Sequence, residues 1–478
     1  MLTPVRIVSV GAAAPELRLS AGDVAAAWGR GGGRGQAAVC ASDEDTLTLA
    51  AEAASRALDA SGIEPGVVDG LWWGTTRPPF AEGPSHAVLS AALGLSSHST
   101  GALCAGSPHA GMEALFGAVD AVAAGSAGVA VVVTSDAILP GLGTTYEGRA
   151  GAGAAAIVVT AEEGPAVMGA RVTRTRPLLD RYRGDRERET RDLYDARLFR
   201  ERIFVPEVRE VASQLATLVV DDWSLPDPDG RLGSVIGRTV GAATPASATV
   251  SQALGDTGAA AALLGGAGAL DHAGTVGLVG FGGGRASGVV ITADGPVPGA
   301  ATVADVIAGG RPATYSEVLR ARGQLTPTGE TVQMGVPPES AFFARGAVEM
   351  LKLLGARCVD CGTINTPPSI HPHCLTCAGD KFEDVPLARH GTVHTYVINH
   401  TMPAPFEAPL PLAVMDLEDG ARIMLQVAGD GASLEIGSEM ELVLRRYAYE
   451  RGVPVYGYKA RLLADRQEAG ERADVKEA

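Results

Sequence analysis

Two C-x2-C motifs, twelve residues apart, constrain the fold of this 478-residue chain more strongly than any other feature of its sequence. They open and close the stretch CVDCGTINTPPSIHPHCLTC and supply Cys358, Cys361, Cys374 and Cys377. Four thiolates at this spacing are typical of a closed, tetrahedral zinc ribbon, whereas a catalytic zinc keeps an open position. His371 and His373 lie between the motifs, but four cysteines already complete the ligand set. We therefore expect a structural zinc site in a small domain.

The other cysteines and the chain start indicate the compartment. Cys40 and Cys104 are isolated, and a cluster of four beside two isolated cysteines favours a reducing compartment over a disulfide framework. The start, MLTPVRIVSVGAAAPE, lacks the basic segment and long apolar core of a signal peptide. No apolar run reaches the roughly 18 residues that a membrane span needs. We expect a cytoplasmic protein that does not enter a membrane.

Length and charge limit the domain number and the partners. A chain of 478 residues exceeds one ordinary hydrophobic core and predicts two or three domains. The formal net charge is −16, and acidic residues also outnumber basic ones from Arg345 to the end. Nucleic-acid binding needs a basic surface that neutralises phosphates. Nucleic acid is therefore not an expected partner.

The first 295 residues alternate between apolar, β-branched segments such as GVAVVVTSDA and alanine-rich segments such as EDTLTLAAEAASRALDASG. This alternation predicts a layered α/β domain. Residues 154–165 (AAAIVVTAEEGP) and 286–296 (ASGVVITADGP) share a small-residue entry, an apolar strand and an acidic-Gly-Pro exit. Each follows a glycine-rich turn, and the two lie about 130 residues apart. Such a repeat indicates a duplicated half-domain, not a short solenoid repeat.

The rest of the chain has a different pattern. A helix (AFFARGAVEMLKLLG), the cysteine cluster and short strands separated by turn residues predict a small β-barrel that follows a ribbon. The densely charged residues 174–204 are expected to form a solvated helix with local ion pairs, or else a segment that caps the active site or contacts another subunit. The expected boundaries are 1–298 for the α/β domain (halves 1–165 and 166–298), 299–339 for a linker, 340–385 for helix and ribbon, 386–465 for the barrel and 466–478 for a tail.

Cys104 is the candidate nucleophile. It lies in STGALCAGSPHAGMEAL, just before a predicted helix, and a helix N-terminus lowers the pKa of a nearby thiol. The alternative is a small buried filler, because free cysteine is among the most buried residue types. His109 follows five residues later, a spacing that on a helix turns it away from Cys104 and favours packing or surface exposure over a role as base.

Three segments resemble the thiolase superfamily, in particular its 3-oxoacyl-carrier-protein synthase III and hydroxymethylglutaryl-CoA synthase branches. GALCAGSPHAGMEAL resembles the segment whose cysteine is acylated by a thioester. GFGGGRASGVVI (280–291) resembles the closing glycine-rich strand, which implies that Gly283 supplies an oxyanion-hole amide opposite that of Cys104. GDTGAAAALLGGAGAL (255–270) resembles the segment that begins Gly-Asn-Thr. The resemblance covers about residues 4–298 and implies a duplicated, thiolase-like five-layer fold.

The remaining part resembles acyl-CoA-associated proteins built from an N-terminal helix, a rubredoxin-like zinc ribbon and an OB-fold. The cysteine spacing, AVMDLEDG and the terminal VYGYKARLL carry this resemblance. Members of that family usually accompany thiolase-like enzymes as separate subunits. The resemblance therefore implies acyl-CoA or an acyl-carrier thioester as substrate, and a homodimer or a complex with a thiolase-type enzyme.

The chain departs from these enzymes at three positions. No histidine lies between residues 110 and 271, where the family's condensing histidine belongs, and SVIGRTVGAAT offers only Arg238. Asp256 replaces the asparagine of Gly-Asn-Thr, and Thr76 stands where hydroxymethylglutaryl-CoA synthases have a glutamate. Acyl transfer onto Cys104 can proceed without these groups, whereas Claisen condensation requires them. We therefore expect a thiolase-like acyltransferase, with C–C bond formation or simple acyl transfer as the next step. The alternative is a non-catalytic acyl-CoA-binding scaffold for a partner thiolase.

Overall fold

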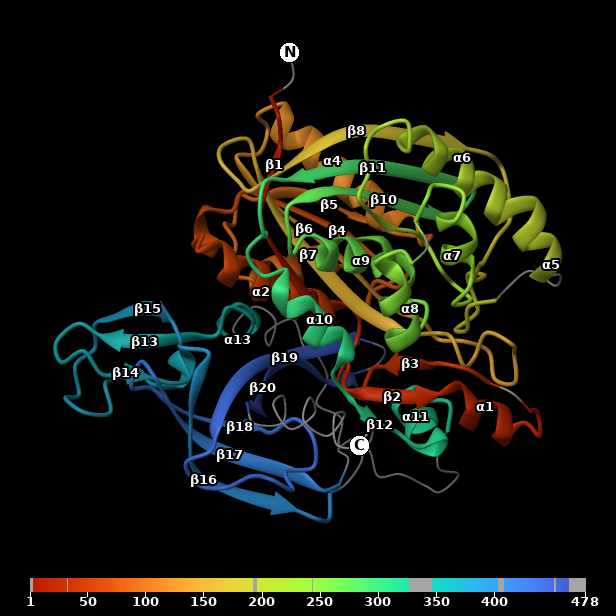
Figure 1. Ribbon diagram of the computed structural model, residues 1–478. Coiled ribbons are helices and arrows are strands. Elements are labelled where there is room, and N and C mark those ends of the chain that lie inside the picture. Colours follow the sequence, from red (N-terminus) through yellow and green to blue (C-terminus); the bar gives the residue numbers. More distant parts are fainter. Residues whose placement is uncertain are drawn as a thin grey trace. The chain divides into compact units, whose positions relative to one another are not determined.

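The apolar strands and alanine-rich helices predicted for the first 295 residues are present in the computed structural model (Figure 1). The structure describes residues 3–31, 33–191, 196–242, 244–325, 346–402, 408–450 and 453–463. The chain divides into two units, Met1–Thr326 (unit 1) and Pro327–Ala478 (unit 2).

The first half of unit 1 is built on five strands in the order β5-β4-β6-β7-β1. β4, β5 and β6 are parallel to one another, and β7 runs antiparallel to both β6 and β1. The elements are β1 (Arg6–Ala13), α2 (Thr46–Ser61), β4 (Gly70–Gly74), α3 (Ser85–Ala92), β5 (Thr100–Cys104), α4 (Ala110–Ala123), β6 (Val129–Ala137) and β7 (Ala152–Thr160).

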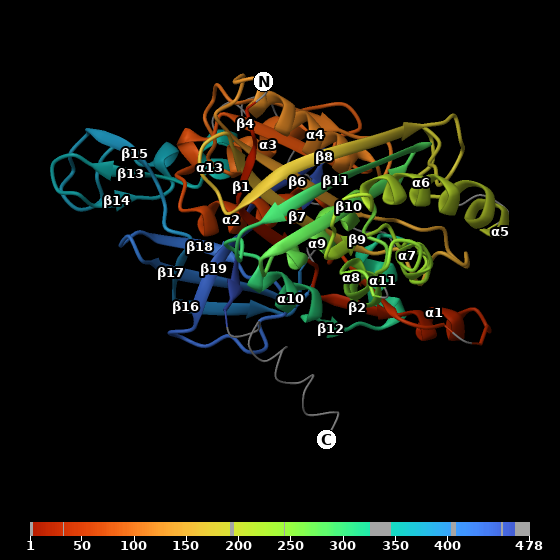
Figure 2. The same cartoon turned by 45° about the horizontal axis from the view of Figure 1, so that its top comes forward.

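The second half repeats this topology. Its strands follow the order β8-β11-β10-β9, with β9 parallel to β10 and the other neighbours antiparallel (Figure 2). β8, β9, β10 and β11 thus correspond to β1, β4, β6 and β7, and the described residues contain no counterpart of β5. The elements are β8 (Ala166–Thr175), α6 (Val205–Leu215), β9 (Asp222–Ser224), α9 (Ala261–Ala269), β10 (Gly274–Gly282) and β11 (Arg285–Ala293). The two sequence segments that indicated a duplication fall on β7 and β11.

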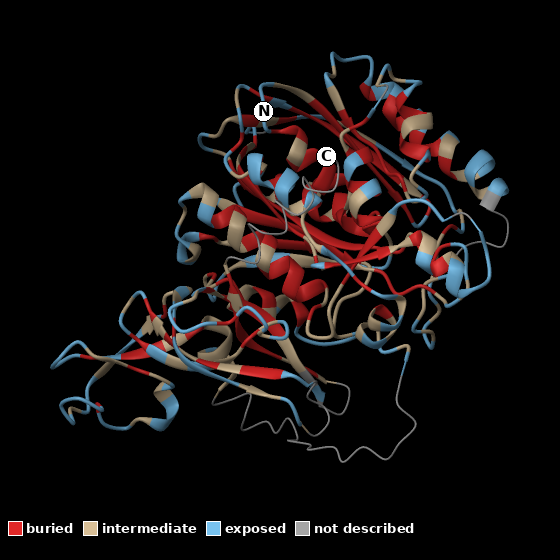
Figure 3. Ribbon diagram, turned by 60° about the horizontal axis from the view of Figure 1, so that its bottom comes forward, coloured by how far each residue is buried: buried red, intermediate tan, exposed pale blue. Residues whose placement is uncertain are grey.

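One apolar cluster joins the two halves. Met112 and Leu115 of α4 pack in it together with Leu263 of α9 and with buried residues of β7 and β11. Figure 3 shows the long stretches of buried chain in the strands and helices at the centre of unit 1. α2 covers β1 so closely that a Cβ at Gly11 would lie 2.4 Å from the carbonyl oxygen of Ala53. Glycine in β1 therefore permits the helix–sheet contact.

Smaller elements complete unit 1. They are β2 (Leu17–Ser20), α1 (Ala21–Ala27), β3 (Gln36–Val39), η1 (Pro65–Val67), α5 (Ala196–Leu198), η2 (Phe199–Phe204), α7 (Leu232–Gly237), α8 (Ser247–Leu254), η3 (Gly258–Ala260), α10 (Ala301–Ala308), β12 (Arg311–Pro312) and α11 (Tyr315–Ala321). Residues 299–325, expected to belong to a linker, instead form α10, β12 and α11. The reason is that Val303 and Val318 are buried in the apolar clusters of this unit.

Unit 2 contains a ribbon and a barrel. The ribbon sheet has the order β14-β13-β15 and the barrel sheet the order β18-β17-β16-β19-β20. A bridge between Val427 and Ala460 joins the end of β18 to β20 and closes the barrel. The elements are α13 (Ala347–Lys352), β13 (Leu354–Cys358), β14 (Ile364–Asn365), η4 (Pro368–Ile370), β15 (Phe382–Pro386), β16 (His390–Asn399), β17 (Leu410–Leu417), β18 (Arg422–Gln426), β19 (Glu439–Glu450) and β20 (Val453–Leu462). Part of the predicted helix 341–355 lies outside the described residues.

A membrane span was not expected from the sequence. Among the helices that the structure describes, none combines the length and the apolar character needed to cross a bilayer.

Candidate active site and metal centre

Cys104 is the last residue of β5, at the edge of the sheet where the parallel strands β4, β5 and β6 all end. It is paired with Gly74 of β4, and the backbone N–H of Thr75 donates to its carbonyl oxygen over 3.0 Å. In open α/β sheets, ligands bind beyond the carboxyl ends of parallel strands. The fold therefore places Cys104 where substrate chemistry is expected.

The expected activation by a helix N-terminus is not present. α4 begins only at Ala110, six residues after Cys104, with His109 as its N-cap residue. A helix dipole acts mainly within the first turn. Burial, reinforced by the charge of Glu113, raises the pKa of the half-buried Cys104 thiol to about 11. The thiol is therefore protonated at neutral pH.

Glu113 itself is held in its ionised form. Hydrogen bonds and charge from His109 and Arg285 lower the pKa of its carboxyl group. His109 is completely buried, and its Nε2 lies 2.8 Å from Ser287 Oγ while its Nδ1 lies 3.3 Å from Glu113 Oε1. His109 thus links the start of α4 to β11, as a packing residue.

Replacing Glu113 with glutamine is expected to lower the pKa of Cys104, because it removes a negative charge that opposes the thiolate. Since the thiolate is the nucleophile, Cys104 should react faster with iodoacetamide at mildly alkaline pH. The measurement is the carbamidomethylation rate of the Cys104 peptide against pH, by mass spectrometry. Glu163→Gln, on an exposed residue of the same unit, is the control. An unchanged rate in the Glu113 variant would refute this electrostatic coupling.

Gly283 lies in the turn between β10 and β11, beside the segment that follows Cys104. Its φ of +58° is in the left-handed region, and a Cβ there would lie 2.9 Å from the Cβ of Ser107. Its backbone N–H donates to Oδ2 of Asp180 over 2.8 Å. The amide predicted to act in an oxyanion hole is therefore close to the Cys104 segment and is hydrogen-bonded to a buried carboxyl group.

Asp180 belongs to a non-helical segment, residues 178–191, that we call the strap. Just before the strap, the N–H of Arg176 donates to the carbonyl oxygen of Gly284 over 2.8 Å. Near its other end, the N–H of Thr190 donates to the carbonyl oxygen of Leu139, also over 2.8 Å. The prediction of a solvated helix is therefore wrong for the strap, whose backbone is non-helical and hydrogen-bonded to other parts of unit 1. Among the described residues of the charged run 174–204, residues 196–204 are helical.

Asp256, the residue in place of the family's asparagine, forms a buried ion pair with Arg181 of the strap. Its Oδ2 also accepts from the hydroxyl of Tyr146 over 2.9 Å, and its Oδ1 accepts from the N–H of Gly258 over 3.0 Å. The guanidinium of Arg181 lies 3.5 Å from the ring centroid of Tyr146. Arg181 thus neutralises the negative charge of Asp256, whereas the uncharged asparagine of the family would not need such a partner.

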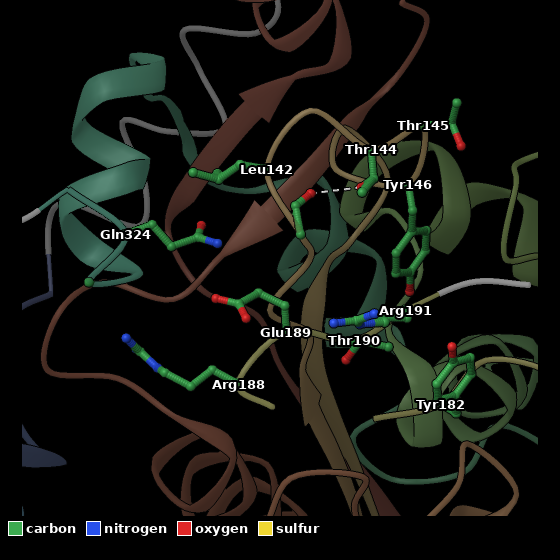
Figure 4. Close-up of a pocket in the computed structure, with 12 residues that line it drawn as sticks. Leu142, Thr144, Thr145, Tyr146, Tyr182, Arg188, Glu189, Thr190, Arg191 and Gln324 are labelled. Atoms are coloured by element: carbon green, nitrogen blue, oxygen red, sulfur yellow. Dashed lines mark hydrogen bonds between the residues drawn. The ribbon is translucent and has the colours of Figure 1, made fainter. Parts of the chain in front are cut away.

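The strap and the segment after β6 line an open pocket of about 790 Å³ in unit 1. Figure 4 shows the side chains of Glu189 and Gln324 pointing toward one another across it. Its lining is rich in hydroxyl and guanidinium groups: Gly141, Leu142, Thr144, Thr145, Tyr146, Tyr182, Arg188, Glu189, Thr190, Arg191, Gly323 and Gln324. Cys104 does not line it. The segment that follows β4 contacts both: the N–H of Thr75 donates to the carbonyl oxygen of Cys104, and Arg77 donates to the carbonyl oxygen of Arg188.

Other side chains around β4 make structural contacts. His86 Nε2 is 2.9 Å from the carbonyl oxygen of Leu71, which ties α3 to β4. Thr76 Oγ1 donates to Oδ1 of Asp136 over 2.7 Å. Asp136, which the sequence did not single out, is completely buried, and burial raises its pKa to about 6. Its other oxygen accepts from the N–H of Ala259, so it joins the two halves.

The four cysteines of the two C-x2-C motifs come together in unit 2, with their sulfur atoms all within 4.8 Å of one another. The sulfurs of Cys358 and Cys377 are 3.6 Å apart, and those of Cys361 and Cys374 are 3.5 Å apart. A tetrahedral zinc site with bonds of about 2.3 Å separates its sulfurs by about 3.8 Å. A Cβ at Gly379 would lie 3.4 Å from two of these sulfurs, so the surrounding loop fits closely around them. The cluster can hold a metal ion.

Comparisons with known proteins give two groups of matches. The family model described as ChsH2, C-terminal OB-fold domain, matches residues 384–445. A DUF35 domain-containing scaffold protein of Methanocaldococcus jannaschii is 39% identical over 113 residues, which is 22% of this chain and 79% of that protein. The benzoylsuccinyl-CoA thiolase subunit BbsA of Thauera aromatica is 34% identical over 133 residues, or 26% of this chain and 90% of that subunit.

The second group of matches consists of synthases. A hydroxymethylglutaryl-CoA synthase of Thermococcus onnurineus is 34% identical over 163 residues, 33% of this chain. The chain spans about half the length, 47%, of that enzyme. The solved structure of MvaS with 3-hydroxy-3-methylglutaryl coenzyme A has a TM-score of 0.57 at 22% identity, with 70% of this chain and 96% of that chain covered. The synthase FabH of Pseudomonas aeruginosa gives 0.52 at 23% identity, with coverages of 61% and 98%. These likenesses confirm the predicted thiolase-like fold, and the family model confirms the predicted OB-fold.

Proposed function

Through its C-terminal part the chain belongs to the DUF35 domain-containing scaffold proteins, and from this premise we propose that its thiolase-like unit is an acyltransferase fused to that scaffold. The enzyme accepts an acyl group from acyl-CoA or an acyl-carrier thioester onto Cys104. The observation that carries the proposal is the place of Cys104, at the carboxyl ends of three parallel strands. The backbone N–H groups of Cys104 and Gly283 are the candidates for stabilising the oxyanion of the tetrahedral intermediate.

The acylation step is a thioester exchange. Sγ of Cys104 attacks the thioester carbonyl carbon, a new C–S bond forms, and the bond to the CoA sulfur breaks. Because the thiol is protonated at rest, its proton must leave as the bond forms, and it ends on the released CoA thiol. The bond that forms is of the same kind as the bond that breaks, so no oxidant, reductant or metal ion is consumed.

Zinc is the metal that we propose for the cysteine cluster. Its four thiolates and their close approach fit a closed structural site. The ion would hold the ribbon's loops together and would take no part in acyl transfer. A thiolase-type enzyme or a second copy of this chain is the proposed protein partner, since the BbsA relative is named as a thiolase subunit.

A second candidate function has a specific observation in its favour. The thiol of Cys104 is not activated, and the amide of Gly283 already donates to Asp180. Both fit a non-catalytic subunit that binds acyl-CoA for a partner thiolase. The relatives of the C-terminal part that are named as scaffold proteins fit this role too.

Release of CoA separates the two candidates. Mixing the wild-type chain with acetyl-CoA is expected to release up to one equivalent of free CoA per chain, detected with a thiol reagent after the protein is removed. Cys104→Ala should release none. Cys40→Ala, the matched change at the other cysteine of unit 1, should behave like wild type. Equal release by wild type and Cys104→Ala would exclude Cys104 as the acceptor.

A further inference from the structure

Asp180 and Arg181, neighbours in the strap, contact the two glycine-rich segments 280–291 and 255–270 that resemble those of thiolase-like enzymes. Oδ2 of Asp180 accepts from the N–H of Gly283 at the β10–β11 turn, over 2.8 Å. Arg181 pairs with Asp256 at the start of the Gly-Asp-Thr segment. Asp180 is only 5% exposed, and the side chain of Arg181 is 14% exposed. One short stretch of chain thus closes over both segments.

The backbone N–H of Gly283, which donates to Asp180, lies in a fixed turn. The turn is fixed by the left-handed conformation of Gly283 and by its packing against Ser107, three residues after Cys104. A fixed N–H donor stabilises a negatively charged oxygen most strongly where water is excluded. In the structure that oxygen belongs to Asp180.

Burial of this carboxyl group needs a compensating interaction. Burial raises the pKa of Asp180, because the charged form loses its hydration, and the hydrogen bond from Gly283 works against that rise. An amide that compensates the desolvation cost of a buried carboxylate by hydrogen bonding can also stabilise another anionic oxygen at the same position. A thioester oxygen in the tetrahedral intermediate is such an anion.

We propose that Asp180 is the resting occupant of an oxyanion- and carboxylate-binding position at the Gly283 amide, and that the strap must withdraw Asp180 before Cys104 is acylated. The acylation part of this inference rests on the proposed function; the anion-binding part does not. Arg181 fixes the strap through Asp256, so Asp180 competes with substrate from a tethered position. The side chain of Asp180 therefore sets the rate of acyl capture without reacting itself.

The variant Asp180→Ala tests both parts. It is expected to release CoA from acetyl-CoA about tenfold to a hundredfold faster than wild type, the factor that a charge-assisted hydrogen bond represents. Asp180→Asn keeps the size and loses the charge, and should lie between the two. Asp185→Ala, at an exposed aspartate of the same strap, should match wild type.

Added acetate supplies a readout that does not depend on acylation. It should raise the melting temperature of Asp180→Ala, because it enters the vacated position, and leave that of wild type unchanged. It should also slow CoA release by Asp180→Ala alone. If acetate stabilises only Asp180→Ala but no variant releases CoA, the anion position stands and the proposed acyl transfer fails. If acetate acts equally on wild type and Asp180→Ala, and both release CoA at one rate, the inference is overturned.

Discussion

A Cys374→Ser variant is expected to lose its metal ion and, with it, the fold of residues 354–386. Cys374 and Cys358 are the two buried members of the cluster, and the ribbon around them has few other buried side chains. A segment of this size cannot bury enough apolar surface to fold by itself. Binding of structural zinc contributes about 10–16 kcal/mol in small zinc-binding peptides, and that free energy is folding free energy.

The measurements are the zinc content of the purified chain and the hydrogen exchange of residues 354–386. Wild type should carry one zinc ion per chain, and Cys374→Ser should carry less and exchange rapidly in the ribbon. His373→Ala is the matched control, because His373 lies between the motifs, is exposed and is not expected to bind the ion. Full zinc occupancy in the serine variant, or loss of zinc in the histidine variant, would show that the ligand set is different.

Replacing Arg181 with alanine is expected to destabilise unit 1 by about 3–5 kcal/mol, the usual cost of leaving a buried charge without its partner. Asp256 would keep its hydrogen bonds from the hydroxyl of Tyr146 and the amide of Gly258 but would lose its ion pair with Arg181. Asp256→Asn removes the charge that Arg181 neutralises. In the Arg181→Ala background it should therefore recover much of the lost stability.

Urea unfolding of the four chains of this double-mutant cycle gives the coupling free energy. Arg183→Ala is the control on the same strap: Arg183 is exposed, donates to the carbonyl oxygen of Glu187, and should change stability by no more than about 0.5 kcal/mol. Additive effects of the Arg181 and Asp256 changes would mean that the pair is not coupled.

The sequence was sufficient for the parts of the fold that are encoded by local pattern. Cysteine spacing predicted the cluster, because four ligands need only correct intervals along the chain. The repeated strand-turn pattern predicted the duplication, because β7 and β11 occupy matching positions in the two halves. Buried, apolar strands and alanine-rich helices carry their own periodicity.

The candidate site was less predictable because it depends on contacts between distant segments. Asp180 and Arg181 look like solvated charges in a charged run, and nothing near them indicates their partners, Gly283 and Asp256. The sequence pattern predicts the start of α4 too close to Cys104. The turn formed by Gly106, which has a φ of +97°, and the following Ser107 and Pro108 delays the helix until Ala110. The raised pKa of Cys104 follows from burial and from the charge of Glu113, and the sequence states neither the burial nor this contact.

The most direct test of acyl transfer to Cys104 is the mass of the intact chain after incubation with acetyl-CoA and with malonyl-CoA, followed by fragmentation of its cysteine peptides. We expect one acyl group per chain, located on the peptide that contains Cys104, at higher occupancy in Asp180→Ala and absent from Cys104→Ala. An adduct that persists in Cys104→Ala, or the lack of any adduct in both wild type and Asp180→Ala, would contradict acyl transfer through this cysteine.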